Sequence, residues 1–124
     1  VVAVAHAGRR GMAAGVVPAA VAAMRDLGAT RVTATVGPSI CPRCYEVPAA
    51  MRDEVAAVQP AAAAVSRHGT PALDVAAGVI DQLAAADVAA HRLTGCTAED
   101  DAWYSYRRDG VTGRFAGLAW LESR

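Results

Sequence analysis

The distribution of apolar positions predicts a chain that alternates between short strands and helices. Apolar or β-branched runs of strand length occur at residues 1–5, 30–36, 88–93 and 115–121. Helix-forming stretches lie between them, at residues 12–27, 48–58 and 73–86. Gly28 is expected to end the first helix, and Pro18 either kinks that helix or lies in its first turn. This order predicts one α/β domain over residues 1–124, with a mixed β-sheet and packed helices.

Composition restricts the kind of core and the classes of partner that we expect. The chain is 54% hydrophobic but has only one Phe, two Trp and three Tyr, so we expect a core of small side chains. Twelve basic and twelve acidic residues cancel, which argues against nucleic acid or an anionic membrane as a partner. No apolar run approaches the roughly 20 residues of a membrane span. Three Cys do not indicate a disulfide framework, so we expect a cytoplasmic protein with reduced thiols.

His6 is the first residue that could carry chemistry. It follows the apolar run at residues 1–5, and ligands of open α/β sheets gather outside the carboxyl ends of strands. A neutral imidazole at such a place can bind a metal, or it can simply be satisfied by the backbone of the turn. Arg9 and Arg10 lead directly into the next helix and offer guanidinium forks for an anion.

Two later segments are further candidates. Residues 37–46 contain Cys41 and Cys44 at the spacing of a zinc or redox motif, but a zinc site needs more ligands and the prolines indicate a rigid loop. We therefore expect this loop to line a pocket, with Cys44 and Tyr45 as walls. In residues 104–110, aromatic side chains beside Arg107 and Arg108 suit a planar, anionic ligand. The alternative is a surface loop in which one of these arginines pairs with the neighbouring carboxylate.

Several motifs in a fixed order carry a resemblance to a known family. They are His-Ala-Gly-x-Arg-Gly from His6, Gly-Pro-x-Ile-x-Pro-x-Cys-Tyr-Glu-Val from Gly37, Leu-Asp-x(7)-Gln-Leu from Leu73, Cys-Thr at Cys96, and Ser-Tyr-Arg-Arg-Asp-Gly-x-Thr-Gly-Arg from Ser105. Over residues 1–117 the chain resembles the multicopper polyphenol oxidase, or laccase-domain, family. That family is associated with purine nucleoside phosphorolysis and adenosine deamination.

The resemblance implies a metal and a fold. The family holds a metal, usually zinc and in the older description copper, through two His and one Cys, and His6 matches the second His. The other two ligands lie upstream of the matched region, and the three cysteines of this chain do not match the ligand Cys. The family's layered fold is cysteine-hydrolase-like, and we expect it to be incomplete here because an N-terminal part is missing. Arg9 stands where the family usually has Trp, and Arg43 where it often has Cys.

The resemblance also implies an activity. It predicts phosphorolysis of adenosine, inosine or guanosine to base and ribose 1-phosphate, and hydrolytic deamination of adenosine, with His6 as catalytic residue and metal ligand. Arg10, Arg107 and Arg108 are the candidates for binding phosphate, and Cys44 for contacting substrate. The alternatives are a copper-dependent polyphenol oxidase, a catalytically incomplete fragment, and an enzyme that edits peptidoglycan precursors. A truncated chain would expose apolar surface, so self-association is also expected.

Overall fold

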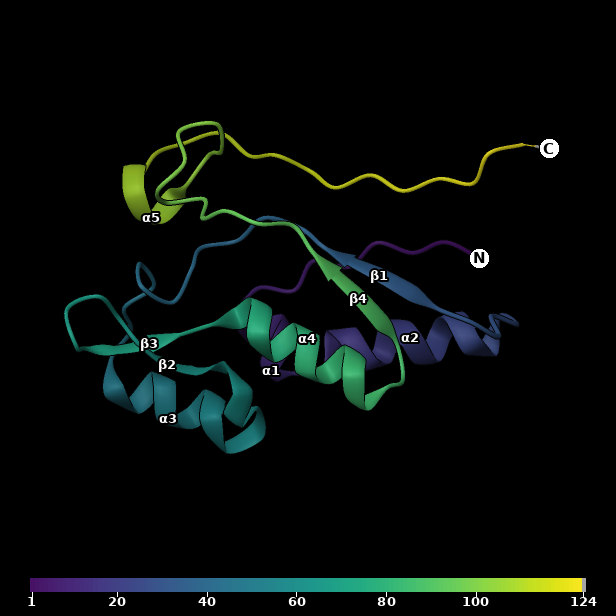
Figure 1. The fold of residues 1–124 in the computed structure, drawn as a ribbon, viewed down its shortest axis with the longest axis horizontal. Coiled ribbons are helices and arrows are strands. Elements are labelled where there is room, and N and C mark those ends of the chain that lie inside the picture. Colours follow the sequence, from purple (N-terminus) through teal and green to yellow (C-terminus); the bar gives the residue numbers. More distant parts are fainter. Residues whose placement is uncertain (124) are drawn as a thin grey trace.

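The computed structural model describes residues 1–123 as short helices with one parallel strand pair and one antiparallel hairpin (Figure 1). Its helices are α1 (Arg9–Ala13), α2 (Val16–Asp26), α3 (Ala49–Val58), α4 (Val75–Ala85) and α5 (Tyr106–Asp109). Its strands are β1 (Thr33–Val36), β2 (Ala63–Val65), β3 (Pro71–Leu73) and β4 (Ala89–Arg92), and a 3₁₀ turn, η1 (Pro60–Ala62), precedes β2. The predicted α/β class is confirmed.

The first predicted helix is in fact two helices. The break falls at Gly15, whose backbone is left-handed with φ of 86°, a conformation that glycine adopts at little cost. Pro18 lies in the first turn of α2, where its missing N–H does no harm, so one of the two predicted placements is confirmed. The helix ends at Asp26, shortly before Gly28, as the sequence predicts.

The strands β1 and β4 pair in parallel, with Thr33 opposite Ala89 and Val36 opposite Arg92. A parallel pair needs a long crossover, and here it contains α3, the β2–β3 hairpin and α4. The helix α4 packs against both strands, and Figure 1 shows α2 and α4 on one side of the pair. Both strands lie within sequence-predicted runs and are shorter than those runs.

The hairpin β2–β3 was not predicted, because its strands have three residues each and are rich in Ala. Leu73, expected at the start of a helix, is instead the last residue of β3. The helix begins two residues later, after Asp74 accepts a hydrogen bond of 3.0 Å from the backbone N–H of Ala77. The hairpin also supports the preceding loop, since Leu73 N–H donates to the carbonyl of Tyr45 (3.2 Å).

One apolar cluster joins the helices to both strand pairs. It is made mainly of valines, which confirms the expected core of small side chains. Its buried members are Met12, Val17, Val21, Val32, Val47, Val55, Ala62, Leu73, Val75, Val79, Leu83 and Val88. Gln82 links two of the packed elements, because its side-chain amide donates to the carbonyl of Met12 (2.9 Å).

The strands predicted at residues 1–5 and 115–121 are wrong for this structure. Both segments are extended and exposed, and neither has a hydrogen-bonded strand partner among residues 1–123. A strand exists only when another strand satisfies its backbone groups, so apolar composition alone does not create one. For the same reason the predicted single mixed sheet is replaced by two separate two-stranded sheets.

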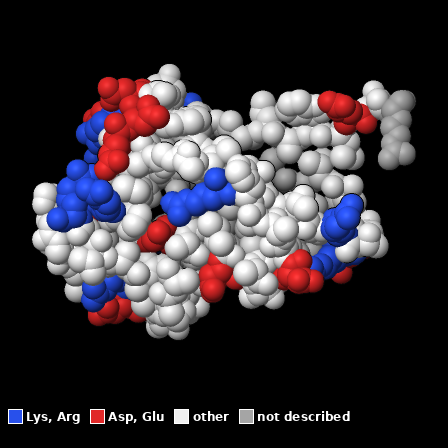
Figure 2. All heavy atoms as spheres, viewed as in Figure 1, with Lys and Arg blue, Asp and Glu red and all other residues white. Residues whose placement is uncertain are grey.

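The surface carries charges of both signs. Figure 2 shows small basic and acidic clusters side by side, without a continuous basic face in this view. Within residues 1–123, none of the helices has the length and apolar character required to cross a bilayer.

Candidate functional site

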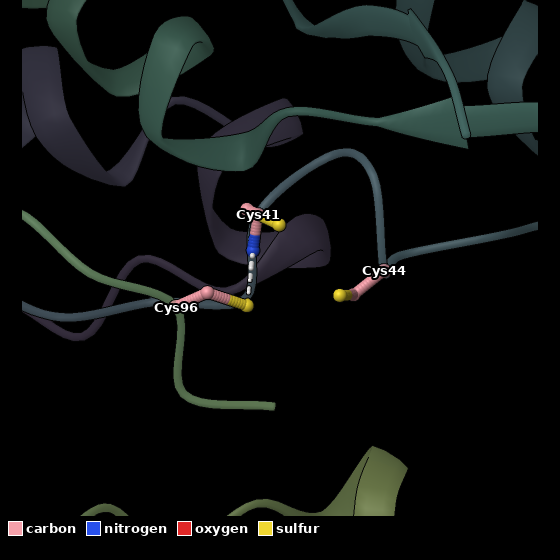
Figure 3. A group of neighbouring side chains, drawn as sticks. All are labelled: Cys41, Cys44 and Cys96. Carbon is pink, nitrogen blue, oxygen red and sulfur yellow. Dashed lines mark hydrogen bonds between the residues drawn. The ribbon is translucent and has the colours of Figure 1, made fainter. Parts of the chain in front are cut away.

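The loop after β1 and the segment after β4 bring three cysteines together (Figure 3). In the loop, the backbone N–H groups of Cys44 and Tyr45 both donate to the carbonyl of Cys41 (3.1 Å each), which forms a tight turn. Beyond the strands, Ser39 continues the parallel pairing with Cys96, and Thr97 N–H donates to the carbonyl of Ser39 (3.0 Å). The buried thiol of Cys96 is thereby placed beside the turn.

The three Sγ atoms lie within 4.8 Å of one another and face a common space (Figure 3). The backbone N–H of Cys41 also donates to the Sγ of Cys96 (3.2 Å). From the sequence, a pocket wall was favoured over a metal or redox role for Cys41 and Cys44, because a zinc site needs more ligands and Cys96 is the only other thiol. The structure corrects that interpretation, since Cys96 supplies a third sulfur and the set could hold a metal ion. We call these residues the cysteine triad.

Two charged residues flank the cysteine triad. The thiol of Cys44 donates to the Oε1 of Glu99 (3.3 Å), and Arg67 donates from one nitrogen to both Cys44 Sγ (2.7 Å) and Glu99. Burial, the Glu99 carboxylate and the neighbouring thiols raise the pKa of Cys44 to about 12. The hydrogen bond from Cys44 and the Arg67 guanidinium together hold the pKa of Glu99 below its usual value.

Cys96 behaves differently from Cys44. Burial acts to raise its pKa, but hydrogen bonds from Cys41 and from the backbone of the following turn outweigh burial and lower it. These donors stabilise a thiolate at Cys96, so the cysteine triad contains one sulfur that is prepared for negative charge.

His6 lies in a second place, a hollow of about 880 Å³. Its lining comes from all three segments that the sequence singled out: His6, Pro38, and Tyr104, Tyr106 and residues 110–115. The imidazole turns back over the glycine turn, so that a Cβ at Gly8 would lie 3.2 Å from the Nε2 of His6. Gly8 therefore allows the close approach that positions His6.

The arginines predicted to bind phosphate do not gather at this hollow. Arg9 and Arg10 are the first residues of α1 and line a separate hollow of about 310 Å³ together with Glu54. The helix has only five residues, so its N-terminus adds little to the attraction of an anion.

Arg107 and Arg108 hold loops together. Arg107 donates to the carbonyl of Glu46 (2.8 Å) and stacks over the ring of Tyr45, 4.8 Å from its centroid. Arg108 donates to the carbonyls of Thr97 (3.1 Å) and Trp103 (3.0 Å). It also pairs with Asp109 (2.8 Å), the pairing that the sequence analysis gave as the alternative. The phosphate roles of these arginines stay predictions.

The predicted site residues thus divide among separate places. Cys44 belongs to the cysteine triad and lines neither of the two hollows, so its substrate contact stays a prediction. Sequence reasoning missed the parts played by Cys41, Cys96, Arg67 and Glu99. The signal was available for Cys41 and Cys96, because each follows a predicted strand, and parallel neighbours end at the same edge of a sheet.

His6 does not form the three-ligand metal site that the resemblance implies with other residues of 1–123. Within residues 1–123, the structure brings His, Cys, Asp or Glu side chains into a group of three or more only at the cysteine triad. His68 and His91, to which we assign no role, are both exposed.

Comparison with known proteins gives the class of protein to which this fold and these motifs belong. The family described as multi-copper polyphenol oxidoreductase laccase matches residues 1–122, so the chain belongs to this family. A purine nucleoside phosphorylase of Streptomyces coelicolor is 56% identical over 98% of the chain and 52% of its own length.

Two other similar relatives carry the same name. A purine nucleoside phosphorylase of Streptomyces griseus is 54% identical over 98% of the chain and 51% of its own length. One from Mycobacterium tuberculosis is 44% identical over 94% of the chain and 48% of its own length. The chain therefore spans about half the length of the curated relatives it matches, and no solved structure was found to match it.

Proposed function

We propose that the protein cleaves purine nucleosides with inorganic phosphate, and that this chain contributes the hollow at His6 to the substrate site. The observation that carries the proposal is the similarity to relatives named purine nucleoside phosphorylases, which extends over nearly the whole chain. The hollow is of a size typical for small-molecule sites, and its tyrosines, Tyr104 and Tyr106, offer flat faces for a purine base.

The reaction defines what the site must do. An oxygen of phosphate forms a bond to the ribose C1′, while the bond between C1′ and the base nitrogen breaks. The electron pair of that bond leaves with the base, which takes up a proton, and the products are free base and ribose 1-phosphate. In this proposal His6 faces the departing base, and Arg114, which lines the same hollow, attracts the anionic phosphate.

The metal that the resemblance implies would require further ligands besides His6. A bound zinc ion would polarise substrate or water, and His6 is the residue of this chain that would ligate it. Deamination of adenosine is proposed as a second activity of the same site, with water replacing the amino group and ammonia leaving. Because His6 lacks partner ligands among residues 1–123, we assign no step of either reaction to the metal.

A copper-dependent phenol oxidase is the second candidate, favoured by the description of the family. Multicopper chemistry requires several imidazole ligands close together. The chain has three His, and within residues 1–123 they do not form a group. We therefore prefer the nucleoside reaction, and a catalytically incomplete chain remains its alternative.

The test measures phosphate-dependent release of hypoxanthine from inosine, with ammonia release from adenosine and oxygen uptake with hydroquinone in parallel. The chain is assayed beside the Streptomyces coelicolor relative, which contains the matched half and more. Phosphorolysis by both proteins supports the proposal, and activity of the relative alone identifies the chain as incomplete. Inactivity of both on every nucleoside would overturn the proposal.

Variants then assign the residues. In the active protein His6→Ala is expected to lower kcat, whereas the exposed His68→Ala is the matched control and leaves it unchanged. Arg114→Ala is expected to raise the KM for phosphate, because Arg114 lines the hollow at His6. Arg10→Ala tests the phosphate role that the resemblance implies for Arg10, which lines the separate hollow, and an unchanged phosphate KM removes Arg10 from the site.

A further inference from the structure

The cysteine triad has the donor atoms of a thiophilic metal site. Three thiols from two separate segments face one another within 4.8 Å. In a tetrahedral zinc site with Zn–S bonds of about 2.3 Å, the sulfurs lie about 3.8 Å apart. The cysteine triad is thus within roughly 1 Å of zinc geometry, and thiolate sulfur is the donor that zinc and other soft metals prefer.

Glu99 lies beside Cys44 at the edge of the cysteine triad, and its carboxylate would turn toward Cys41 and Cys96 to complete a four-ligand site. A turn that begins at Cys96 brings it there, since the backbone N–H groups of Glu99 and Asp100 both donate to the carbonyl of Cys96 (3.2 and 2.9 Å). Its Oε1 lies 3.3 Å from the Sγ of Cys44. A sulfur and a carboxylate oxygen on one tetrahedral zinc lie about 3.5 Å apart, which is close to this spacing.

We propose that Cys41, Cys44, Cys96 and Glu99 bind one Zn²⁺ ion, which fastens the loop after β1 to the segment after β4. The proposal does not depend on the proposed nucleoside activity. Three thiolates and one carboxylate fill the four positions of a tetrahedral zinc and leave none for water. The ion is therefore structural, and it performs no catalytic step.

The surroundings of the cysteine triad match those of thiolate ligands. The N–H of Cys41 donates to the Sγ of Cys96, and Arg67 donates to the Sγ of Cys44. Such outer donors orient ligands and spread their charge. The four ligands carry four negative charges against two on zinc, so Arg67 offsets half of the excess. Arg67 is itself fixed by a backbone hydrogen bond to the carbonyl of Arg43 (3.2 Å).

The first test uses the unmodified chain, purified under reducing conditions and dialysed against metal-free buffer. We expect about one zinc per chain, and X-ray absorption that reports three sulfurs and one oxygen around it. Cobalt in its place is expected to give the intense visible bands of a tetrahedral thiolate site. Zinc surrounded only by nitrogen and oxygen would overturn the proposal. So would three thiols that react freely with a thiol reagent, or a disulfide between Cys41 and Cys44.

Variants assign the ligands. Cys44→Ser removes a half-buried thiol and is expected to lose the zinc, and circular dichroism checks that the fold remains. Glu99→Gln is expected to weaken zinc binding by about tenfold or more, whereas Asp101→Asn, whose side chain is fully exposed, is the matched control. Zinc affinity that is unchanged in Cys44→Ser overturns the site, and an unchanged value in Glu99→Gln overturns the four-ligand form proposed here.

Discussion

The cysteine triad and the hollow at His6 differ in how firmly the fold holds their side chains. The cysteine triad lies just beyond two paired strands, and backbone hydrogen bonds fix both of its segments. The hollow is bounded by extended, exposed chain on the His6 side and by irregular chain after α5. The metal-binding donor atoms of the cysteine triad are already close together, whereas the hollow at His6 offers a single imidazole and a wide surface.

Motif density and structural order do not coincide in this chain. His6 belongs to the motif that most strongly indicated chemistry, yet its neighbours within residues 1–123 leave it exposed. The cysteines looked unpromising along the sequence and became a compact cluster in space. The order of a site depends on which backbone groups are paired around it, as the pairing of Ser39 with Cys96 shows.

Leu73→Ala should change stability most and should affect the cysteine side first. Leu73 is 0% exposed, and its N–H donates to the loop that carries Cys41 and Cys44. Loss of buried leucine methyl groups destabilises a protein by about 2–5 kcal/mol. Urea denaturation measures the loss, and hydrogen exchange is expected to speed up in residues 41–47.

Leu118→Ala is the matched control for that substitution. Leu118 is 82% exposed, so the change should stay within about 0.5 kcal/mol. Equal losses for the two variants would show that the segment at residues 115–121 is packed in solution, which would remove the contrast between the two regions.

Arg108→Lys tests the connection between the two regions. Arg108 joins α5, beside the hollow, to the carbonyl of Thr97, next to Cys96. An ammonium group keeps the charge but cannot reach several carbonyls at once, so residues 97–103 should exchange amide hydrogens faster. Exposed Arg31→Lys is the control. Unchanged exchange with a raised phosphate KM would instead establish the phosphate role.

The smallest expected effect is a pH dependence of stability caused by Asp109, which lies near the hollow at His6. A hydrogen bond from Arg108 and the ion pair with it hold the pKa of Asp109 below its usual value. A carboxyl with a lowered folded pKa stabilises the fold above its unfolded pKa, and this contribution is lost as the pH falls through the folded pKa. Below about pH 4, the Tm of the wild-type protein should therefore fall further than the Tm of the Asp109→Asn variant.

Asp26→Asn, at the end of α2, is the control for the pH series. It should follow wild type through the same range. If Asp109→Asn also follows wild type, the pair with Arg108 contributes nothing measurable, and α5 depends on its other contacts.

Local signals in the sequence predicted much of the fold. Pro48 and Gly28 marked the boundaries of helices, and the runs that became β1 and β4 were recognised by composition. The hairpin β2–β3 was not predicted, because strands of three residues that are rich in Ala are too short to show a strand pattern. The apolar run at residues 1–5 was misjudged because strand formation depends on a partner that the run itself does not specify.

The site was less predictable for the same physical reason. The cysteine triad forms because the register of β1 against β4 places Ser39 beside Cys96. The sequence of either strand alone does not determine that register. The roles of Arg67 and Glu99 depend on that register in turn. The hollow at His6 likewise joins candidate segments that the sequence analysis had treated separately, because their order along the chain does not show that they meet.

The parallel pairing of β1 with β4 also has a kinetic consequence. A long loop must close before these strands gain any contact, and pairing of this kind is intrinsically slow. The cysteine triad belongs to the same closure, because Cys96 lies beyond β4. During synthesis Cys41 and Cys44 leave the ribosome before Cys96, so for a time they lack the third thiol of the triad. A reducing environment therefore matters most while the chain is being made, when an early oxidant would find two thiols close together and no ligand set.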